Sequence, residues 1–177
     1  MSLNLVNGLP AHILIVHFVI VLVPLSALAV VVGAMWPGAA RRMGLVLPLL
    51  ALVTLASVPL ATQAGEWLEK HVDSNALVRR HTELGDGMLP WAVGLFVLAT
   101  VVWWTNRRPA AADAPGDRTR RAPSRSVLVV RIVAAVLAVG VASGAVVEVY
   151  RIGDSGARAA WHDGFSKTAT GDKGDNG

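Results

Sequence analysis

The chain has 177 residues, of which 54% are hydrophobic and only 16% are charged, so it is too apolar for an ordinary soluble domain. Its net charge of +4 comes from 16 Lys and Arg against 12 Asp and Glu, and it contains no cysteine. The lack of cysteine excludes a disulfide, a thiolate metal site and a covalently attached c-type heme.

Four apolar runs follow one another along the chain, and each is long enough to cross a membrane. A bilayer core about 30 Å thick requires ~20 apolar residues per helix, which is met by residues 11–36, 43–64, 85–105 and 126–150. A soluble helical bundle fits such runs poorly, and a cleaved signal peptide usually begins with basic residues, which residues 1–11 lack. We therefore predict an all-α integral membrane protein, with a four-helix bundle within residues 1–161.

The first run opens with GLPAHILIVHF, which contains two histidines, His12 and His17. Because five residues correspond to about 140° around a helix, these side chains cannot face the same direction. His17 is flanked by apolar residues on both sides, and it requires a hydrogen-bonding or metal partner if it faces the bundle. We therefore predict that His17 points inward and that His12 lies at the rim.

Polar residues at the ends of the other three runs are expected at the same depth. Counting ~20 residues from the opposite boundary of each run places Glu66, His81 and Glu148 within about one turn of the level of His17. His17 and His81 form the predicted pair, with His12 nearby, and Glu66 and Glu148 are the candidate carboxylate partners. A solvated helix end explains isolated polar residues at this level equally well.

The connections between runs one and two and between runs three and four are rich in arginine. They carry Arg41, Arg42, Arg107, Arg108, Arg118, Arg120, Arg121 and Arg125. The positive-inside rule therefore places these connections in the cytoplasm and both termini outside. Residues 107–125 are expected to form a flexible cytoplasmic linker, and residues 162–177 a disordered tail. Topology and contacts with lipid headgroups explain the arginines, so no nucleic-acid partner is expected.

A histidine pair on two helices of a membrane bundle is typical of several functions. It can supply both axial ligands of a b-type heme, and we expect such a heme or a similar redox centre near the outer face. The same histidines with Glu66 or Glu148 can instead hold a divalent metal ion. A proton relay, a quinone contact and a packing hydrogen bond from His17 to Glu66 are further alternatives.

A second class of function involves no chemistry at the histidines. The chain would then be a non-catalytic subunit or scaffold that packs against a larger complex, or forms a homo-oligomer, within the lipid bilayer. Transport is least favoured, because the middle of each span lacks charge. The sequence contains no phosphate-binding glycine loop and no HExxH motif, so hydrolase functions have no support.

The chain resembles a family of small bacterial membrane proteins known as domain of unknown function 2231. The similar segments are GLPAHILIVHF, TQAGEWLE, HTELGDGMLPWA and VYRIGDSGARAAW, in this order. The family's motif histidines correspond to His12, His17 and His81, whereas Val19 stands where the family usually has proline. The resemblance implies a bacterial inner membrane protein, and relatives joined to iron–sulfur or cytochrome-type domains imply membrane electron transfer with a partner protein or membrane complex.

Overall fold

The computed structural model describes residues 5–6, 9–71, 75–107 and 125–161. These residues form β1 (Leu5–Val6), β2 (Leu9–Pro10), α1 (Ala11–Met35), α2 (Pro37–Met43), α3 (Val46–Glu69), α4 (Ala76–Asp86), α5 (Met88–Asn106) and α6 (Arg125–Trp161). The two short strands pair in antiparallel fashion before α1 begins. Most of the predicted linker and the predicted tail lie outside the described residues.

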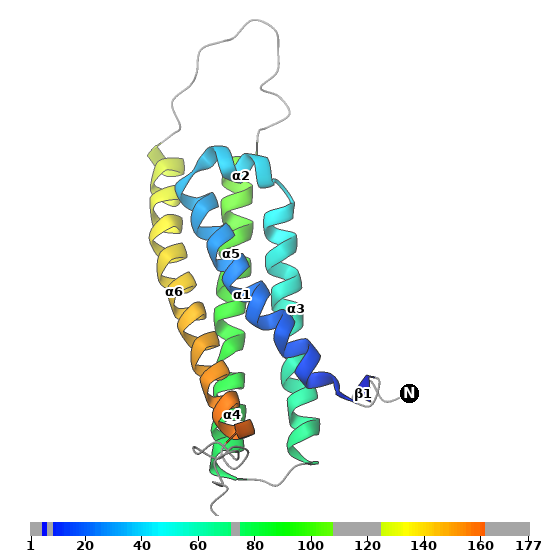
Figure 1. Ribbon diagram of the computed structural model, residues 1–177. Coiled ribbons are helices and arrows are strands. Elements are labelled where there is room, and N and C mark those ends of the chain that lie inside the picture. The colour runs from blue at the N-terminus through cyan, green and yellow to red at the C-terminus, as the bar shows by residue number, and fades with distance from the viewer. Residues whose placement is uncertain (1–4, 7–8, 72–74, 108–124, 162–177) are drawn as a thin grey trace, which may run out of the picture.

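The four long helices run alternately up and down and form one bundle (Figure 1). α1 packs against α3 and α6, and α5 packs against the same two helices. α2 crosses one end of the bundle, whereas α4 extends α5 at the other end and contacts α6 (Figure 1). Among the described residues, four helical segments are long and apolar enough to cross a membrane, which confirms the predicted all-α membrane bundle.

The last helix is longer than the apolar run that predicted it. That run ends at Tyr150, but α6 continues to Trp161. The extra turns pack against α4, so helix–helix contact sustains them where apolar composition does not. The extension brings the last turns of α6 beside α4.

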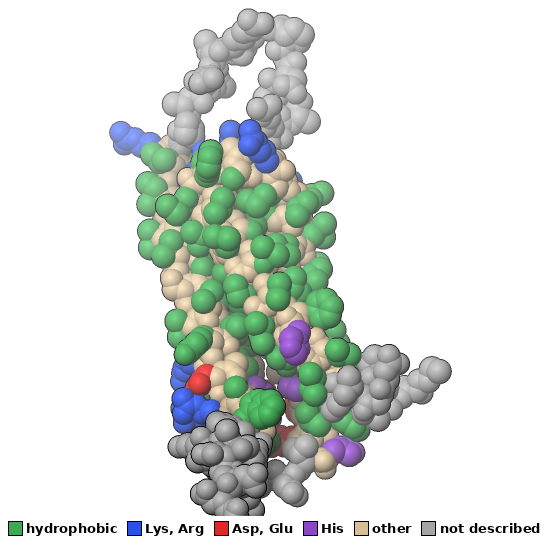
Figure 2. Space-filling model, in the orientation of Figure 1, with side chains coloured by type: hydrophobic (Ala, Val, Ile, Leu, Met, Phe, Trp, Pro, Cys, Tyr) green, Lys and Arg blue, Asp and Glu red, His purple; other side chains and the backbone are tan. Residues whose placement is uncertain are grey.

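Small residues line the interior of the bundle, and large apolar residues cover its outside. Buried alanines come from all four long helices, among them Ala27, Ala51, Ala92, Ala99, Ala138 and Ala145. Figure 2 shows hydrophobic side chains over the middle of the visible face. Since lipid tails are as apolar as these side chains, helices in a membrane gain most from close backbone packing, which small residues permit.

Two contacts inside the bundle fix neighbouring helices. Ser26 Oγ lies 2.6 Å from Thr54 Oγ1, which joins α1 to α3 by a buried hydrogen bond. Trp91 of α5 packs against Gly144 of α6, where an added Cβ would lie 2.2 Å from the indole ring. Only glycine therefore fits at position 144 with the Trp91 side chain in this position.

Glycine and asparagine set the connections at the two ends. Gly44 ends α2 with φ of 51°, a left-handed conformation that favours glycine, and its N–H donates to Ala40 O at 3.0 Å. The side chain of Asn75 caps α4 by accepting hydrogen bonds from the N–H groups of Leu77 and Val78 at 2.9 Å. The cap fixes where α4 begins and hence which of its residues face α6.

Candidate histidine site

His12 lies in the first turn of α1 and reaches across to α3. Its Nδ1 donates to the backbone carbonyl of Ala61 at 2.9 Å. Because a carbonyl oxygen can only accept, this contact requires the ring proton on Nδ1 and leaves the lone pair on Nε2. The ring of His12 is thus held by a helix other than its own.

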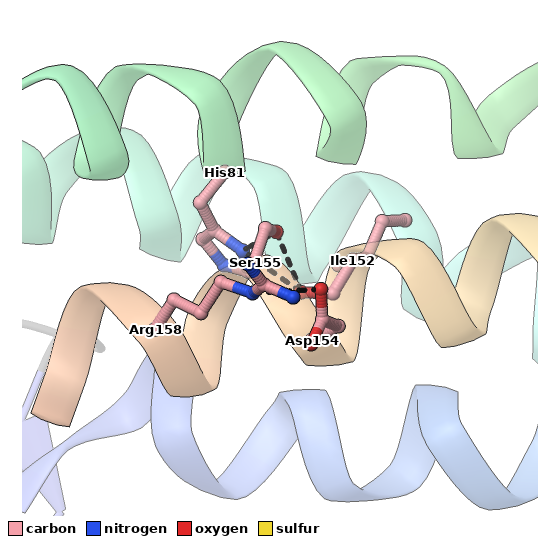
Figure 3. Close-up of polar contacts among 5 residues, drawn as sticks. All are labelled: His81, Ile152, Asp154, Ser155 and Arg158. Carbon is pink, nitrogen blue, oxygen red and sulfur yellow. Dashed lines mark hydrogen bonds and ion pairs between the residues drawn. The ribbon is translucent and has the colours of Figure 1, made fainter. Parts of the chain in front are cut away.

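His81 projects from α4 onto the extended part of α6 (Figure 3). Its Nδ1 lies 3.2 Å from Ile152 O and 3.0 Å from Ser155 Oγ, and Ser155 Oγ itself donates to Ile152 O at 2.8 Å. The carbonyl again requires the proton on Nδ1. An ion pair between Asp154 and Arg158, at 3.0 Å, lies on the neighbouring turn of α6 (Figure 3).

The two imidazoles lie close to each other at one end of the bundle, which we call the histidine end. Their ring centres are 6.1 Å apart, and the ring planes are inclined at 83°. Both rings line a cavity of about 60 Å³ whose other walls are mainly apolar, including Val16, Met88 and Ile152. Neither Nε2 forms a hydrogen bond within the part of the chain that the structure describes. The site therefore combines two fixed imidazoles, each with a free lone pair, in an apolar pocket.

Each imidazole lies against a glycine. A Cβ added at Gly65 would lie 3.1 Å from Cε1 of His12, and one added at Gly156 would lie 3.0 Å from Cε1 of His81. Both distances are shorter than ordinary carbon–carbon contacts, so these glycines provide the space that the rings occupy. Sequence reasoning missed both glycines because their only signal is proximity to residues distant in the chain.

The prediction that His17 points inward and His12 lies at the rim is wrong. His17 is exposed on the side of α1 that faces away from the bundle, and its Nδ1 lies 2.5 Å from Ile13 O, one turn earlier in the same helix. The two histidines do project in different directions, as their spacing requires. The pair with His81 is therefore formed by His12, and His17 has its hydrogen-bond partner within its own helix.

The predicted carboxylate partners do not join the pair. Glu66 is exposed near the end of α3. Glu148 is largely buried, but its Oε2 pairs with Arg151 at 3.1 Å, and its Oε1 lies 3.2 Å from the position of a Cβ added at Gly87. Among the described residues, no group of three His, Cys, Asp or Glu side chains is placed to hold a metal ion.

A family model matches the chain, but no individual curated protein or solved structure does. A family model described as "Predicted membrane protein (DUF2231)" matches residues 8–169, a region that includes all four long helices, His12 and His81. The chain therefore belongs to the DUF2231 family of predicted membrane proteins.

Proposed function

We propose that this protein transfers electrons in the bacterial inner membrane and that His12 and His81 hold a b-type heme or a similar metal centre. The observation that supports this proposal is the pairing of two imidazoles from different helices, each with its Nδ1 on a backbone carbonyl. An Nδ1–H held in this way fixes the orientation of the ring and makes Nε2 the metal-binding atom. When bound, such a centre supplies a one-electron couple.

His12 and His81 would hold a metal ion through their Nε2 atoms, because each Nδ1 is engaged by a backbone carbonyl. Their ring centres are 6.1 Å apart, which brings both candidate ligands to one place. Gly65 and Gly156 leave both rings room to keep this position.

The available space distinguishes two versions of the proposal. A cavity of about 60 Å³ accommodates a metal ion with a few waters, since one water requires roughly 10–15 Å³. The ligand set fits a heme, but a porphyrin is larger than this cavity. Heme binding therefore requires the helices around the cavity to move apart. The small cavity therefore favours a second candidate function, a metal-ion binding protein with water in place of Glu66 and Glu148.

We further propose that the histidine end faces outward. Arg41, Arg42, Arg107 and Arg125 lie at the opposite end of the bundle, which we call the arginine end. The positive-inside rule assigns such an end to the cytoplasm, and both termini of the chain then lie outside. A redox partner would approach the metal centre from the outer face.

Optical spectra and metal analysis of one preparation test this proposal. The protein is purified in mild detergent from a heme-supplied host, oxidised and reduced spectra are recorded, and iron, copper, zinc and manganese are measured per chain. A Soret band that shifts on reduction supports heme, and about one metal ion per chain without that band supports the metal-ion version. Neither heme nor metal in a folded preparation would contradict both versions, and co-purification with other subunits would then favour a scaffold.

A further inference from the structure

The arginine end contains a cavity much larger than the one between the histidines. Its volume is about 600 Å³, and it lies between α2, the turn at Gly44 and the last turn of α5. Three arginines contribute to its wall, namely Arg41, Arg42 and Arg107. Figure 2 shows basic side chains at this end of the hydrophobic body, and further ones at the opposite end. A cavity of this size is in the range of small-molecule binding sites.

No carboxylate of the described residues pairs with these arginines. Within the described residues, the ion pairs join Arg151 to Glu148 and Arg158 to Asp154, all on the part of α6 at the histidine end. Arg107 instead stacks on Trp104, with its Cζ 3.1 Å from the ring centre. Its guanidinium is thus held in place by an aromatic ring and keeps its hydrogen-bond donors for an anion.

A fourth guanidinium lies behind the wall of the cavity. Arg131 of α6 donates from Nη2 to Asn106 Oδ1 at 3.0 Å and to Thr105 O at 3.3 Å, and Asn106 lines the cavity. The Nε of Arg131 is buried and has no hydrogen-bond partner within the described part of the chain. Because its contacts with the described residues are to neutral oxygens, Arg131 adds a positive charge beside the cavity that no described carboxylate compensates.

We propose that this cavity, the arginine cavity, binds the phosphate group of an anionic ligand at the membrane surface. Guanidinium groups bind phosphate oxygens through paired, charge-assisted hydrogen bonds. Basic pockets between membrane helices bind anionic lipid headgroups, and tryptophans such as Trp103 and Trp104 are enriched at headgroup level. The phosphate can belong to a phospholipid headgroup or to a soluble phosphate compound.

The arrangement goes beyond what membrane orientation requires. The positive-inside rule needs only basic residues in a connection, without a particular arrangement of their side chains. Here Arg41 and Arg42 of α2 and Arg107 at the end of α5 line one cavity. Asn106 in its wall holds a fourth, partly buried arginine, Arg131 of α6. Placing an uncompensated charge in such a position is costly, and an anion in the cavity would offset that cost.

Lipid and phosphate binding to matched arginine variants tests the proposal. Delipidated protein in mild detergent is titrated separately with phosphatidylglycerol, phosphatidylcholine and inorganic phosphate, and bound ligand is counted by native mass spectrometry. The test variant is Arg41→Gln/Arg42→Gln. The control is Arg79→Gln/Arg80→Gln, which removes two adjacent exposed arginines from α4 and causes the same change in net charge.

The wild type should prefer phosphatidylglycerol to phosphatidylcholine, and the test variant should lose about 10- to 30-fold in phosphatidylglycerol affinity while the control loses little. The same loss for inorganic phosphate, without a lipid preference, would support the site and identify a soluble ligand. The proposal would be overturned if wild type and test variant bound these ligands equally, or if the test and control variants lost the same affinity. Should the test variant fail to fold by circular dichroism, Arg107→Gln is compared with Arg79→Gln under the same criteria.

Discussion

The two histidines of α1 differ in what holds their rings. His12 is bound to a carbonyl of α3, so its orientation is fixed relative to a second helix. His17 is bound to a carbonyl of its own helix and lies on the outer face of the bundle. A ligand site needs side chains that are held in place before the ligand arrives. Only His12 meets this requirement together with His81.

Gly156 and Gly153, both in α6, are a matched pair of positions for testing the space around the His81 side chain. An added Cβ at Gly156 would lie 3.0 Å from the His81 ring, whereas at Gly153 it would meet nothing within 4 Å. We expect Gly156→Ala to displace the ring and lower heme or metal occupancy about 10-fold, as changes around metal ligands typically do. Gly153→Ala should retain full occupancy.

Both substitutions replace glycine by alanine within one helix, so each should gain about 0.5–1 kcal/mol in helix stability. Occupancy per chain, measured on purified protein together with thermal unfolding, separates this shared gain from the effect on His81. Equal occupancy in the two variants would show that Gly156 does not shape the site.

At the scale of elements, α6 is central because it serves both the bundle core and the histidine site. Its middle packs against α5, where Trp91 occupies the space at Gly144. Its last turns supply Ile152 and Ser155, which hold His81. Because α4 leads directly into α5, tight packing of α5 on α6 also helps to hold His81 of α4 beside the last turns of α6.

Gly144→Ala should destabilise the bundle because a Cβ there would lie 2.2 Å from the Trp91 ring. Overpacking of this kind costs about 1–3 kcal/mol in the free energy of unfolding. Gly140→Ala, one turn earlier and with nothing within 4 Å, is the control and should not destabilise. Denaturant titration in mixed micelles measures both.

Trp91→Leu should restore part of the stability that Gly144→Ala removes, since the two positions share one space. A coupling energy of about 0.5–3 kcal/mol is expected for residues in contact. Strictly additive effects of the two substitutions would contradict the packing described for this pair.

At the scale of the whole molecule, the bundle has two chemically different ends. The histidine end contains the small apolar cavity, and the arginine end contains the large basic one. We expect a reporter enzyme that is active only outside the cytoplasm to be active when it is fused after Gly177. The same reporter should be inactive when it is inserted within residues 108–124. A cytoplasmic signal from the terminal fusion would reverse the orientation and place the histidine pair on the inner side.

The sequence predicted the four membrane helices because lipid imposes a length and composition that few other environments require. It predicted that α6 would stop near residue 150, because nothing in the local pattern indicates that α4 packs beside the following turns. The inward face of α1 was also missed, since that helix is apolar on all sides. The small residues of α1 indicate its inward face, because Ser26, Ala27 and Gly33 lie within about 60° of His12 around the helix.

The binding role of the histidine pair is tested most directly by two single variants of α1. Bound heme or metal per chain is measured in His12→Ala and in His17→Ala, purified side by side with the wild type. We predict that His12→Ala loses the bound group and that His17→Ala keeps the wild-type amount, since only His12 faces His81. Retention by His12→Ala with loss by His17→Ala would contradict the proposed site.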